Sequence, residues 1–309
     1  MRGLVIGAAA TVVLLAAGCS GGSAEPAGPG AAARDDTAQA ASLLDGTYSV
    51  AKTPGAGADT WMARSACDGD GCVATVSIVD PNRTDGIPFR TKVFDLIDGR
   101  WTAVGEDPGR CTPEATGEPL DTAVWTVITL QPRPDGTLTG TYDEAAAVGA
   151  CTGRRTLELT RVADVNPRIR LADPSAEPAR LSSPATALRG SYTYTQTHPP
   201  TGTAFPVEHY RGETHCLRTG ERCQTLLRGE DDAVLALTFA DGRWTGSTPA
   251  LPADCPQIPT ARYVTTSSYD IPTSPADPLE VLTGRAHQVV TGGCDSTFDL
   301  DLELTRTGD

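Results

Sequence analysis

The same arrangement of cysteines occurs twice along this chain of 309 residues, and this repeat constrains the fold more than any other feature. With Cys19 set aside, each half contains a close pair of cysteines followed by two widely spaced single cysteines. The two sets are Cys67, Cys72, Cys111 and Cys151, and then Cys216, Cys223, Cys255 and Cys294. A pattern that recurs in the same order indicates a duplicated structural unit, so we expect two tandem domains of one fold.

Short motifs support the duplication because they recur at nearly the same offset. The matching motifs, at offsets of 144, 143 and 145 residues, are Gly46-Thr47-Tyr48 with Gly190-Ser191-Tyr192, Asp98-Gly99-Arg100-Trp101-Thr102 with Asp241-Gly242-Arg243-Trp244-Thr245, and Leu157-Glu158-Leu159-Thr160-Arg161 with Leu302-Glu303-Leu304-Thr305-Arg306. A stretch with four prolines separates the two copies. The sequence therefore predicts a first domain at 43–165, a Pro-rich linker at 166–187 and a second domain at 188–309.

The N-terminal segment has the pattern of an export signal. Arg2 supplies a positive charge, residues 4–17 are mainly apolar, and small side chains stand directly before Cys19. This segment resembles the lipobox of bacterial lipoproteins. The resemblance implies that a signal peptide at 1–18 is removed and that Cys19 is acylated. Residues 19–42 would then form a flexible tether to the outer face of the cell membrane. The alternative is an ordinary signal peptide that is cleaved nearby, with Cys19 incidental.

The other eight cysteines are expected to form disulfides, because an even number of cysteines in an exported chain is typical of a disulfide framework. Four cysteines allow three connectivities in each repeat. Local geometry favours Cys67 with Cys72 and Cys216 with Cys223, since each pair flanks a short turn-forming segment. The remaining partners would be Cys111 with Cys151 and Cys255 with Cys294. A four-cysteine zinc site in each repeat is the competing interpretation, but the spacings differ from those of structural zinc knuckles.

Each repeat has the pattern of an antiparallel β domain. The segments 93–97 and 100–104 are joined by Asp98-Gly99, which is typical of a tight β-hairpin turn. In that register Leu96 pairs with Trp101, and in the second copy Phe239 pairs with Trp244, so both tryptophans are expected to face the core. The outward positions include Glu158 and Glu303, which alternate with leucines on the closing strands.

Further strands are expected at 46–50, 60–66, 72–79, 124–130, 137–142 and 155–161, and helical periodicity is nearly absent. The spacing suggests seven or eight antiparallel strands per repeat, which would form a barrel or a sandwich. Alternating first and last strands favour closure into a barrel, since their pairing removes the sheet edges. This architecture resembles the calycin-type barrels.

A more specific resemblance rests on the order of the motifs. Gly-Thr-Tyr48, Ser65-x-Cys67-x4-Cys72, Asp98-Gly-Arg-Trp101 and Pro134-Asp-Gly-Thr-Leu-Thr-Gly140 look like a repeat found in mycobacterial-type exported proteins. Some of these proteins resemble the extracytoplasmic portions of actinobacterial serine/threonine kinases. The resembling motifs are turns, cysteines and core aromatics, so they imply no catalytic residue. The Gly-rich loop, His-Arg-Asp and Asp-Phe-Gly motifs of kinase catalytic domains are absent from the sequence.

Charge and composition exclude some functions and leave others open. The net charge of −14, without a basic patch, argues against a nucleic-acid partner. Only Lys52 and Lys92 among the 25 basic residues are lysines, which indicates a GC-rich coding sequence and hence an actinobacterium. The four histidines all lie in the second repeat, and their spacing predicts no metal site. No cofactor or catalytic residue is predicted.

Three functions remain after these exclusions. The first is a non-enzymatic, membrane-anchored binding or sensing module whose partner is an envelope protein or a small apolar ligand. The second is a structural or accessory envelope lipoprotein, and the third is a cell-envelope hydrolase. An open apolar cavity would favour the first, whereas interiors filled by Trp101 and Trp244 would favour the second. A cleft containing His209, His215 and carboxylates would favour the third.

Overall fold

The computed structural model describes residues 43–55, 58–69, 71–79, 87–114, 116–230, 233–256 and 258–309. Cys19, the predicted signal peptide at 1–18 and the predicted tether at 19–42 lie outside these described residues. Within the described ranges, no helix is long and apolar enough to cross a membrane.

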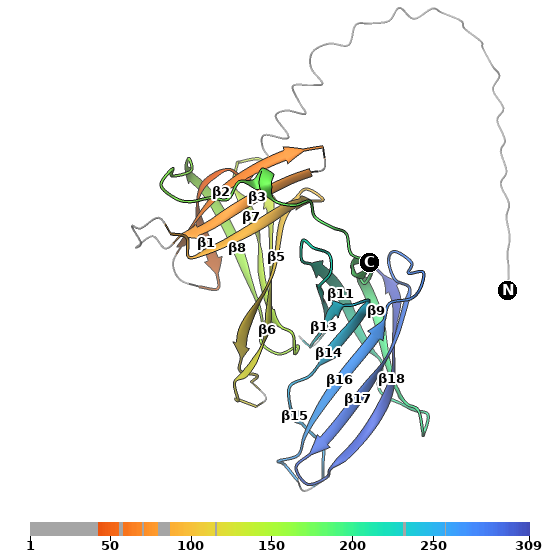
Figure 1. The fold of residues 1–309 in the computed structure, drawn as a ribbon. Coiled ribbons are helices and arrows are strands. Elements are labelled where there is room, and N and C mark those ends of the chain that lie inside the picture. Colours follow the sequence, from red (N-terminus) through yellow and green to blue (C-terminus); the bar gives the residue numbers. More distant parts are fainter. Residues whose placement is uncertain are drawn as a thin grey trace, which may run out of the picture. The chain divides into compact units, whose positions relative to one another are not determined.

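Eight antiparallel strands of the first repeat form a closed barrel (Figure 1). The strands are β1 (Gly46–Thr53), β2 (Ala58–Asp68), β3 (Gly71–Val79), β4 (Arg90–Ile97), β5 (Arg100–Cys111), β6 (Leu120–Pro132), β7 (Leu138–Ala146) and β8 (Thr152–Ala163). Each strand pairs with the next one along the chain, and β1 also pairs with β8. The predicted pairing of the first and last strands is therefore confirmed, and the sandwich alternative is wrong for this repeat.

The second repeat closes in the same way, through pairing of β9 with β18. Its eight barrel strands are β9 (Gly190–His198), β11 (Glu208–Cys216), β12 (Cys223–Gly229), β13 (Val234–Ala240), β14 (Arg243–Ser247), β16 (Arg262–Asp270), β17 (Val281–Thr291) and β18 (Ser296–Gly308). Two short strands, β10 (Thr203–Ala204) and β15 (Leu251–Pro252), pair with β9 and β16. The all-β fold class with two tandem barrels is confirmed.

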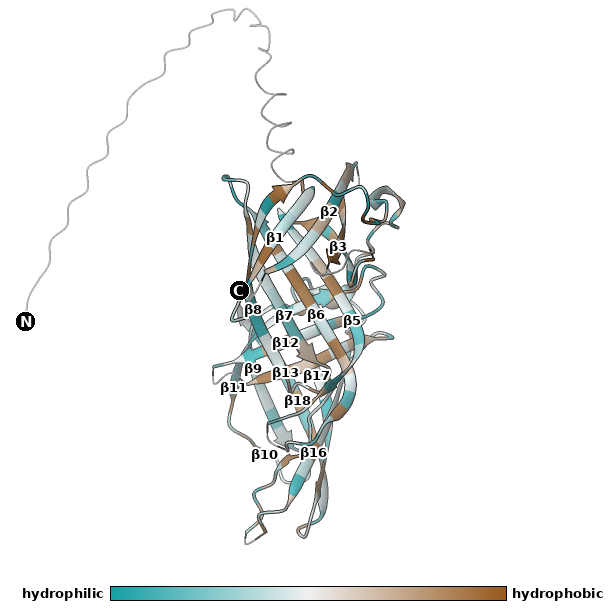
Figure 2. Cartoon of the chain, turned by 90° about the vertical axis from the view of Figure 1, so that its left-hand side faces the viewer, coloured by the Kyte–Doolittle hydropathy of each residue, from teal (hydrophilic) through white to brown (hydrophobic). Residues whose placement is uncertain are grey.

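Alternation of apolar and polar residues explains why these strands curl around a core. On β8, Leu157 and Leu159 are buried, whereas Glu158 between them is exposed, and Glu303 on β18 is exposed in the same way. Figure 2 shows hydrophobic and hydrophilic residues alternating along the strands. Successive side chains of a strand point to opposite faces, so one row of each strand fills the barrel and the other meets solvent.

The Asp-Gly hairpins have the conformation and register that the sequence predicts. Asp98 and Gly99 have φ angles of 50° and 74°, and Asp241 and Gly242 have 52° and 75°. Two successive residues with positive φ match the twist of the flanking strands. The pairs are Leu96 with Trp101 and Phe239 with Trp244, and both tryptophan side chains are fully buried.

The eight cysteines lie in four pairs at disulfide-bonding distance, and none of the pairs crosses between the repeats. The structure joins Cys67 to Cys72, Cys111 to Cys151, Cys216 to Cys223 and Cys255 to Cys294. These are the partners that local geometry favours from the sequence. The close pairs face each other across the β2–β3 and β11–β12 hairpins.

The Pro-rich linker contains two short 3₁₀ helices, η1 (Pro174–Ala176) and η2 (Pro184–Ala187). Upstream of η1, the hydroxyl of Thr75 on β3 donates to the Ala172 carbonyl oxygen at 2.7 Å. After η2, the Thr214 hydroxyl on β11 donates to the Leu188 carbonyl oxygen, also at 2.7 Å. The segment is thus bonded to a strand of the first barrel and to a strand of the second.

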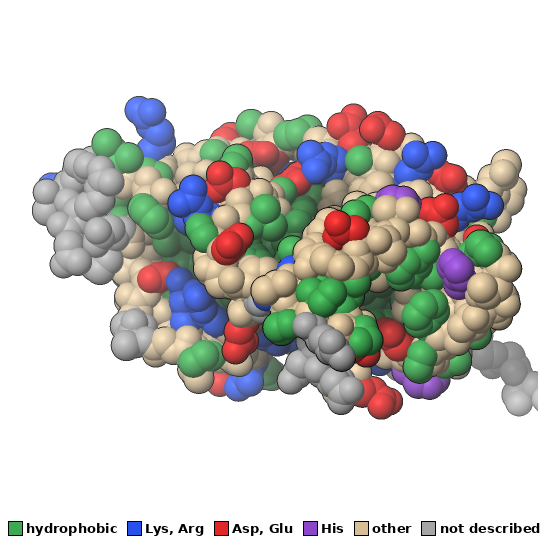
Figure 3. Space-filling model, turned by 90° about the horizontal axis from the view of Figure 1, so that it is seen from below, with side chains coloured by type: hydrophobic (Ala, Val, Ile, Leu, Met, Phe, Trp, Pro, Cys, Tyr) green, Lys and Arg blue, Asp and Glu red, His purple; other side chains and the backbone are tan. Residues whose placement is uncertain are grey.

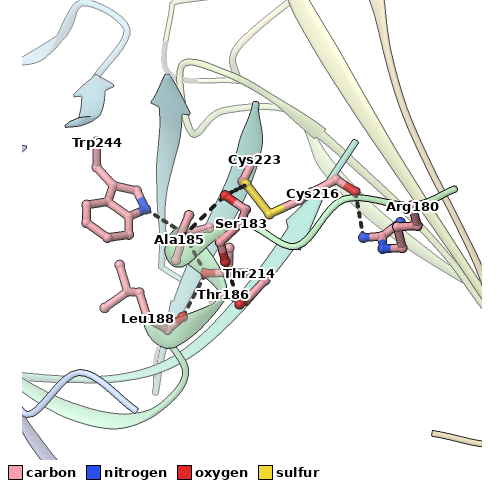
Figure 4. Close-up of a disulfide and its surroundings, with 10 residues drawn as sticks. Arg180, Ser183, Ala185, Thr186, Leu188, Thr214, Cys216, Cys223 and Trp244 are labelled. Atoms are coloured by element: carbon pink, nitrogen blue, oxygen red, sulfur yellow. Dashed lines mark hydrogen bonds between the residues drawn. A yellow bond between two sulfur atoms is a disulfide. The ribbon is translucent and has the colours of Figure 1, made fainter. Parts of the chain in front are cut away.

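One end of each barrel is closed by residues that precede its first strand. Ala185 and Leu188 are fully buried in the core of the second barrel, beside the pair Cys216–Cys223 and Trp244 (Figure 4). Leu44 is buried in the same way in the core of the first barrel. The closed end of each barrel is thus packed, and any interior space lies toward the opposite end.

Candidate functional site

Each barrel is hollow at the end opposite its closed end, and we call this end the barrel mouth. The cavity in the first-barrel mouth measures about 540 Å³, and the cavity in the second-barrel mouth measures about 910 Å³. Trp101 and Trp244 fill the core nearer the closed ends, so the interiors are filled at one end and open at the other. Concave sites of this size are typical of small-molecule binding.

Strand register identifies which residues of the two mouths are equivalent. Lys52 on β1 pairs with Leu157 on β8, and Gln196 on β9 pairs with Leu302 on β18, in accordance with the offsets found in the sequence. The same comparison makes Lys92 on β4 equivalent to Leu235 on β13, because they pair with Val76 and Leu227. The two mouths can therefore be compared position by position.

The second-barrel mouth is largely apolar and aromatic. Its lining includes Tyr194, Gln196, Phe205, Glu208, Tyr210, Leu235, Tyr263, Ser267, Gln288, Val290, Phe298 and Leu300. Figure 3 views the molecule from below and shows hydrophobic side chains gathered around a hollow. Two acids are the only charged side chains among the described lining residues, Glu208 and Asp254.

Three tyrosines pack together along the inner wall of the second barrel. The rings of Tyr194 and Tyr210 meet edge to face with centroids 5.8 Å apart. The Tyr269 hydroxyl lies beside Tyr194 and Ser267 but forms no hydrogen bond of good geometry with a described group. Burial raises the pKa of Tyr194 to about 12, partly offset by its contact with Tyr269. The tyrosines are therefore uncharged at neutral pH.

Glu208 is bonded within the second-barrel mouth rather than free to act on a substrate. The Tyr210 hydroxyl donates a hydrogen bond to the Glu208 carboxylate. Burial raises the pKa of Tyr210 well above its ordinary value, and the neighbouring carboxylate raises it further. The pair presents the tyrosine ring to the cavity.

Smaller side chains account for the larger cavity of the second barrel. Ser267 pairs with Ala286, and the equivalent pair in the first barrel is Ile128 with Tyr142. Replacing an isoleucine and a tyrosine by a serine and an alanine removes a large side-chain volume from the wall. The larger cavity of the second barrel therefore results from smaller residues at two paired positions of its sequence.

The first-barrel mouth is charged. Its lining includes four cationic side chains, Lys52, Arg90, Lys92 and Arg155, and two acidic ones, Asp59 and Glu144. Trp61, Ile78 and Ile128 form an apolar floor below them. The lining of this cavity is therefore net positive, whereas the whole chain has a net charge of −14.

The cations of the first-barrel mouth differ in how they are paired. Lys52 forms a salt bridge with Asp59 on the neighbouring strand. Among the described residues, Lys92 has only longer contacts, at 3.9 Å to an Asp107 carboxylate oxygen and 3.4 Å to the Thr126 hydroxyl, and its side chain is 13% exposed. Burial lowers the pKa of Lys92, and the effect of Asp107 opposes this shift.

The arginines line the same mouth without an acidic partner among the described residues. The Arg155 guanidinium lies over the Tyr142 ring, 5.8 Å from its centroid. The Arg90 guanidinium lies 5.3 Å from the centroid of the Phe89 ring. Aromatic contacts of this kind orient a guanidinium. The Arg90 side chain also interacts with the Tyr142 hydroxyl. A guanidinium has five N–H donors, so further donors stay available to a ligand.

The histidines do not assemble with carboxylates into a described metal or hydrolytic site. His287 Nδ1 lies 2.8 Å from an Asp299 carboxylate oxygen at an exposed position, and His215 Nε2 lies 4.0 Å from Glu213. Neither His209 nor His215 lines the described barrel cavities. Among the described residues, no group of three or more metal-ligating side chains comes together.

The geometry defines a class of protein, namely tandem disulfide-stapled β-barrels with hollow mouths. Residues 36–176 match the family model of the sensor domain of the PknI serine/threonine-protein kinase. The first repeat is therefore similar to a kinase sensor domain, a module distinct from a catalytic domain. This match agrees with the resemblance to extracytoplasmic portions of kinases found in the motifs.

Solved structures of the same kinase domain are also similar to the chain. The monomer form of the M. tuberculosis PknI sensor domain has 22% sequence identity and a TM-score of 0.34, covering 43% of this chain and 97% of that chain. Its dimer form has 22% identity and a TM-score of 0.34, covering 38% of this chain and 80% of that chain. A comparison with curated protein sequences finds no match.

Proposed function

We propose that this protein is a non-enzymatic binding or sensing module of the cell envelope, anchored to the outer face of the membrane through Cys19, and that its second barrel takes a small apolar ligand. The observation that carries this proposal is the cavity of about 910 Å³ in the second-barrel mouth. The match of the first repeat to a kinase sensor domain supports a sensing role.

The chemistry of the second-barrel mouth fits an uncharged ligand with a large apolar surface. Leu235, Phe298 and Leu300 provide apolar wall, and the tyrosines provide flat aromatic faces with few free polar groups. Burial of apolar surface contributes about 25 cal/mol per Å² removed from water. The described lining of this mouth contains no cationic side chain that could pair with an acidic ligand. Its carboxylate Glu208 is already bonded to Tyr210.

The test is a search for bound molecules in the purified soluble form that begins at residue 42. Native mass spectrometry should detect a co-purifying neutral molecule. After its removal, the neutral fluorescent probe N-phenyl-1-naphthylamine should bind in a one-to-one ratio. A protein that purifies empty and binds no neutral probe would favour a structural role instead.

A matched pair of variants localises the binding. Ser267→Ile introduces the residue of the equivalent first-barrel position and fills the second cavity, so probe affinity should fall about tenfold or more. Thr266→Ile adds the same side chain at the neighbouring exposed position and should leave affinity unchanged. Equal effects of the two variants would place the probe elsewhere.

A further inference from the structure

The two lysines of the chain lie together in the first-barrel mouth. Of the 25 basic residues, only Lys52 and Lys92 are lysines, and both line the same cavity. They come from strands β1 and β4, which are not neighbours in the barrel. The fold thus brings two flexible ammonium groups from distant parts of the sequence to one cavity.

The structure assigns to this mouth a second binding site, separate from the second-barrel cavity, for an organic anion with an apolar body, such as a long-chain carboxylate. The site would hold the anionic head between the lysines and arginines of the mouth. The apolar body would lie against Trp61, Ile78 and Ile128 on the cavity floor. This assignment does not depend on what occupies the second barrel.

Comparison of the two barrels shows that the fold itself does not require these charges. In the second barrel, uncharged residues stand at three of the cationic positions. They are Gln196 at the position of Lys52, Leu235 at that of Lys92 and Leu300 at that of Arg155. The second barrel closes with the same register around these uncharged side chains. Of these cations, Lys92 is the one that burial holds largely out of water, and barrel stability does not explain the desolvation energy that this placement costs.

Several hydrogen-bond donors of the first mouth are unsatisfied or weakly satisfied. The indole N–H of Trp61 is buried and has no hydrogen-bond partner among the described residues, although this side chain lines the cavity. In the second barrel the equivalent position is Tyr210, whose hydroxyl is bonded to Glu208. Arg90 and Arg155 form no ion pair with a described acid, and Lys92 has only its longer contacts. An anionic oxygen at this place would accept from these donors.

The apolar floor distinguishes an amphiphilic anion from a free inorganic one. Trp61 and Ile128 are 1% exposed and close the cavity from below, so a bare phosphate would leave this apolar surface unused. A ligand with both a charged head and an apolar body matches the charge at the rim and the surface at the floor.

The test is isothermal titration calorimetry with laurate as the ligand. The protein is the full chain with Cys19→Ala, so that no acyl group of its own competes for the site. We expect saturable binding in the unaltered mouth. The double variant Lys52→Gln and Lys92→Leu takes the residues of the second barrel and should weaken laurate binding about ten- to a hundredfold. The control Arg133→Gln removes an exposed cation outside the mouth and should have no effect. Unchanged laurate affinity in the double variant would overturn the assignment.

Two comparison ligands separate the head from the body. Dodecanol has the same chain without the charge, so its binding should not respond to the double variant. Inorganic phosphate has the charge without the chain and should bind far more weakly than laurate. Phosphate binding as tight as that of laurate would contradict the amphiphilic class, and equal losses for dodecanol would show that the lysines act only through packing.

A second measurement needs no mouth variant and does not depend on how the double variant folds. An amine-reactive ester modifies lysine side chains, and this chain has only two of them. Laurate should slow the modification of both Lys52 and Lys92, as followed by peptide mass spectrometry, whereas dodecanol should not. Equal modification rates with and without laurate would refute a carboxylate seated between the two ammonium groups.

Discussion

Removal of the long-range disulfide of the first barrel is expected to destabilise the protein more than removal of the hairpin disulfide. Cys111 and Cys151 are 40 residues apart, whereas Cys67 and Cys72 are 5 apart. If a cross-link acts by restricting the unfolded chain, its contribution increases with the logarithm of the loop length. This relation gives about 4 kcal/mol for the long loop and about 2 kcal/mol for the short one.

The perturbation is a pair of double variants, Cys111→Ala with Cys151→Ala and Cys67→Ala with Cys72→Ala. Guanidinium chloride unfolding followed by tryptophan fluorescence gives the free energy of unfolding. The first barrel contains Trp61, Trp101 and Trp125, three of the four tryptophans of the chain, so the signal reports mainly on this barrel. We expect the first double variant to lose about 2 kcal/mol more than the second.

The result that would refute this reasoning is an equal loss for both variants, or a larger loss for the hairpin disulfide. Either outcome would show that packing of the sulfur atoms, and not chain restriction, determines their contribution. The second barrel provides a repetition, because Cys255 and Cys294 are 39 residues apart and Cys216 and Cys223 are 7 apart. The same order of losses is expected there.

Four further predictions concern the core, the titratable groups and the anchor. Gly140→Ala places a Cβ atom 1.7 Å from a backbone carbonyl oxygen of β6 and should cost about 1–3 kcal/mol or more in chemical unfolding, whereas Gly153→Ala meets no atom within 4 Å and should be nearly neutral. Because burial raises the pKa of Tyr194 to about 12, absorbance titration should show its phenolate forming late, with stability kept below pH 10 and lost as the pH rises toward 12. Burial lowers the pKa of Lys92, so the folded state binds this proton less tightly than the unfolded state does. The Lys92→Leu variant should therefore raise the thermal midpoint at pH 7, where the lysine is charged, and raise it less near pH 10. Cys19→Ala should release the protein from membranes in a fractionation experiment, and unchanged partitioning would contradict lipid anchoring.

Much of the fold could be predicted because its signals are local. The Asp-Gly turns fix the hairpins, and from them alternation fixes which face of each strand is buried. Trp101 and Trp244 follow from that register alone. Closure also followed from the alternating first and last strands. What sequence could not provide was the shape of the interior, because this depends on strand tilt and on side-chain volumes from several strands at once.

The candidate site was missed although part of its signal is present. Alternation places Lys52 on the same face as Tyr48 and Val50, and places Lys92 on the same face as Phe94. Two lysines on core-facing rows are unusual, and this local pattern is the signal that could have pointed to a charged interior. Their meeting in one cavity could not be deduced, since β1 and β4 are brought to a common mouth only by the curvature of the closed barrel.

The seam that closes each barrel also sets how these domains must fold. In the first barrel, the Thr47 hydroxyl donates to the Asp164 carbonyl oxygen across a sequence separation of 117 residues, and in the second, the Ser191 hydroxyl donates to the backbone oxygen of Asp309 across 118. The chain must therefore lose the conformational entropy of closing a very long loop before these contacts form. This favours slow folding, on the scale of milliseconds to seconds. Until β8 or β18 arrives, β1 and β9 have an unpaired edge, so a chain that loses its last strand should aggregate rather than form a smaller barrel.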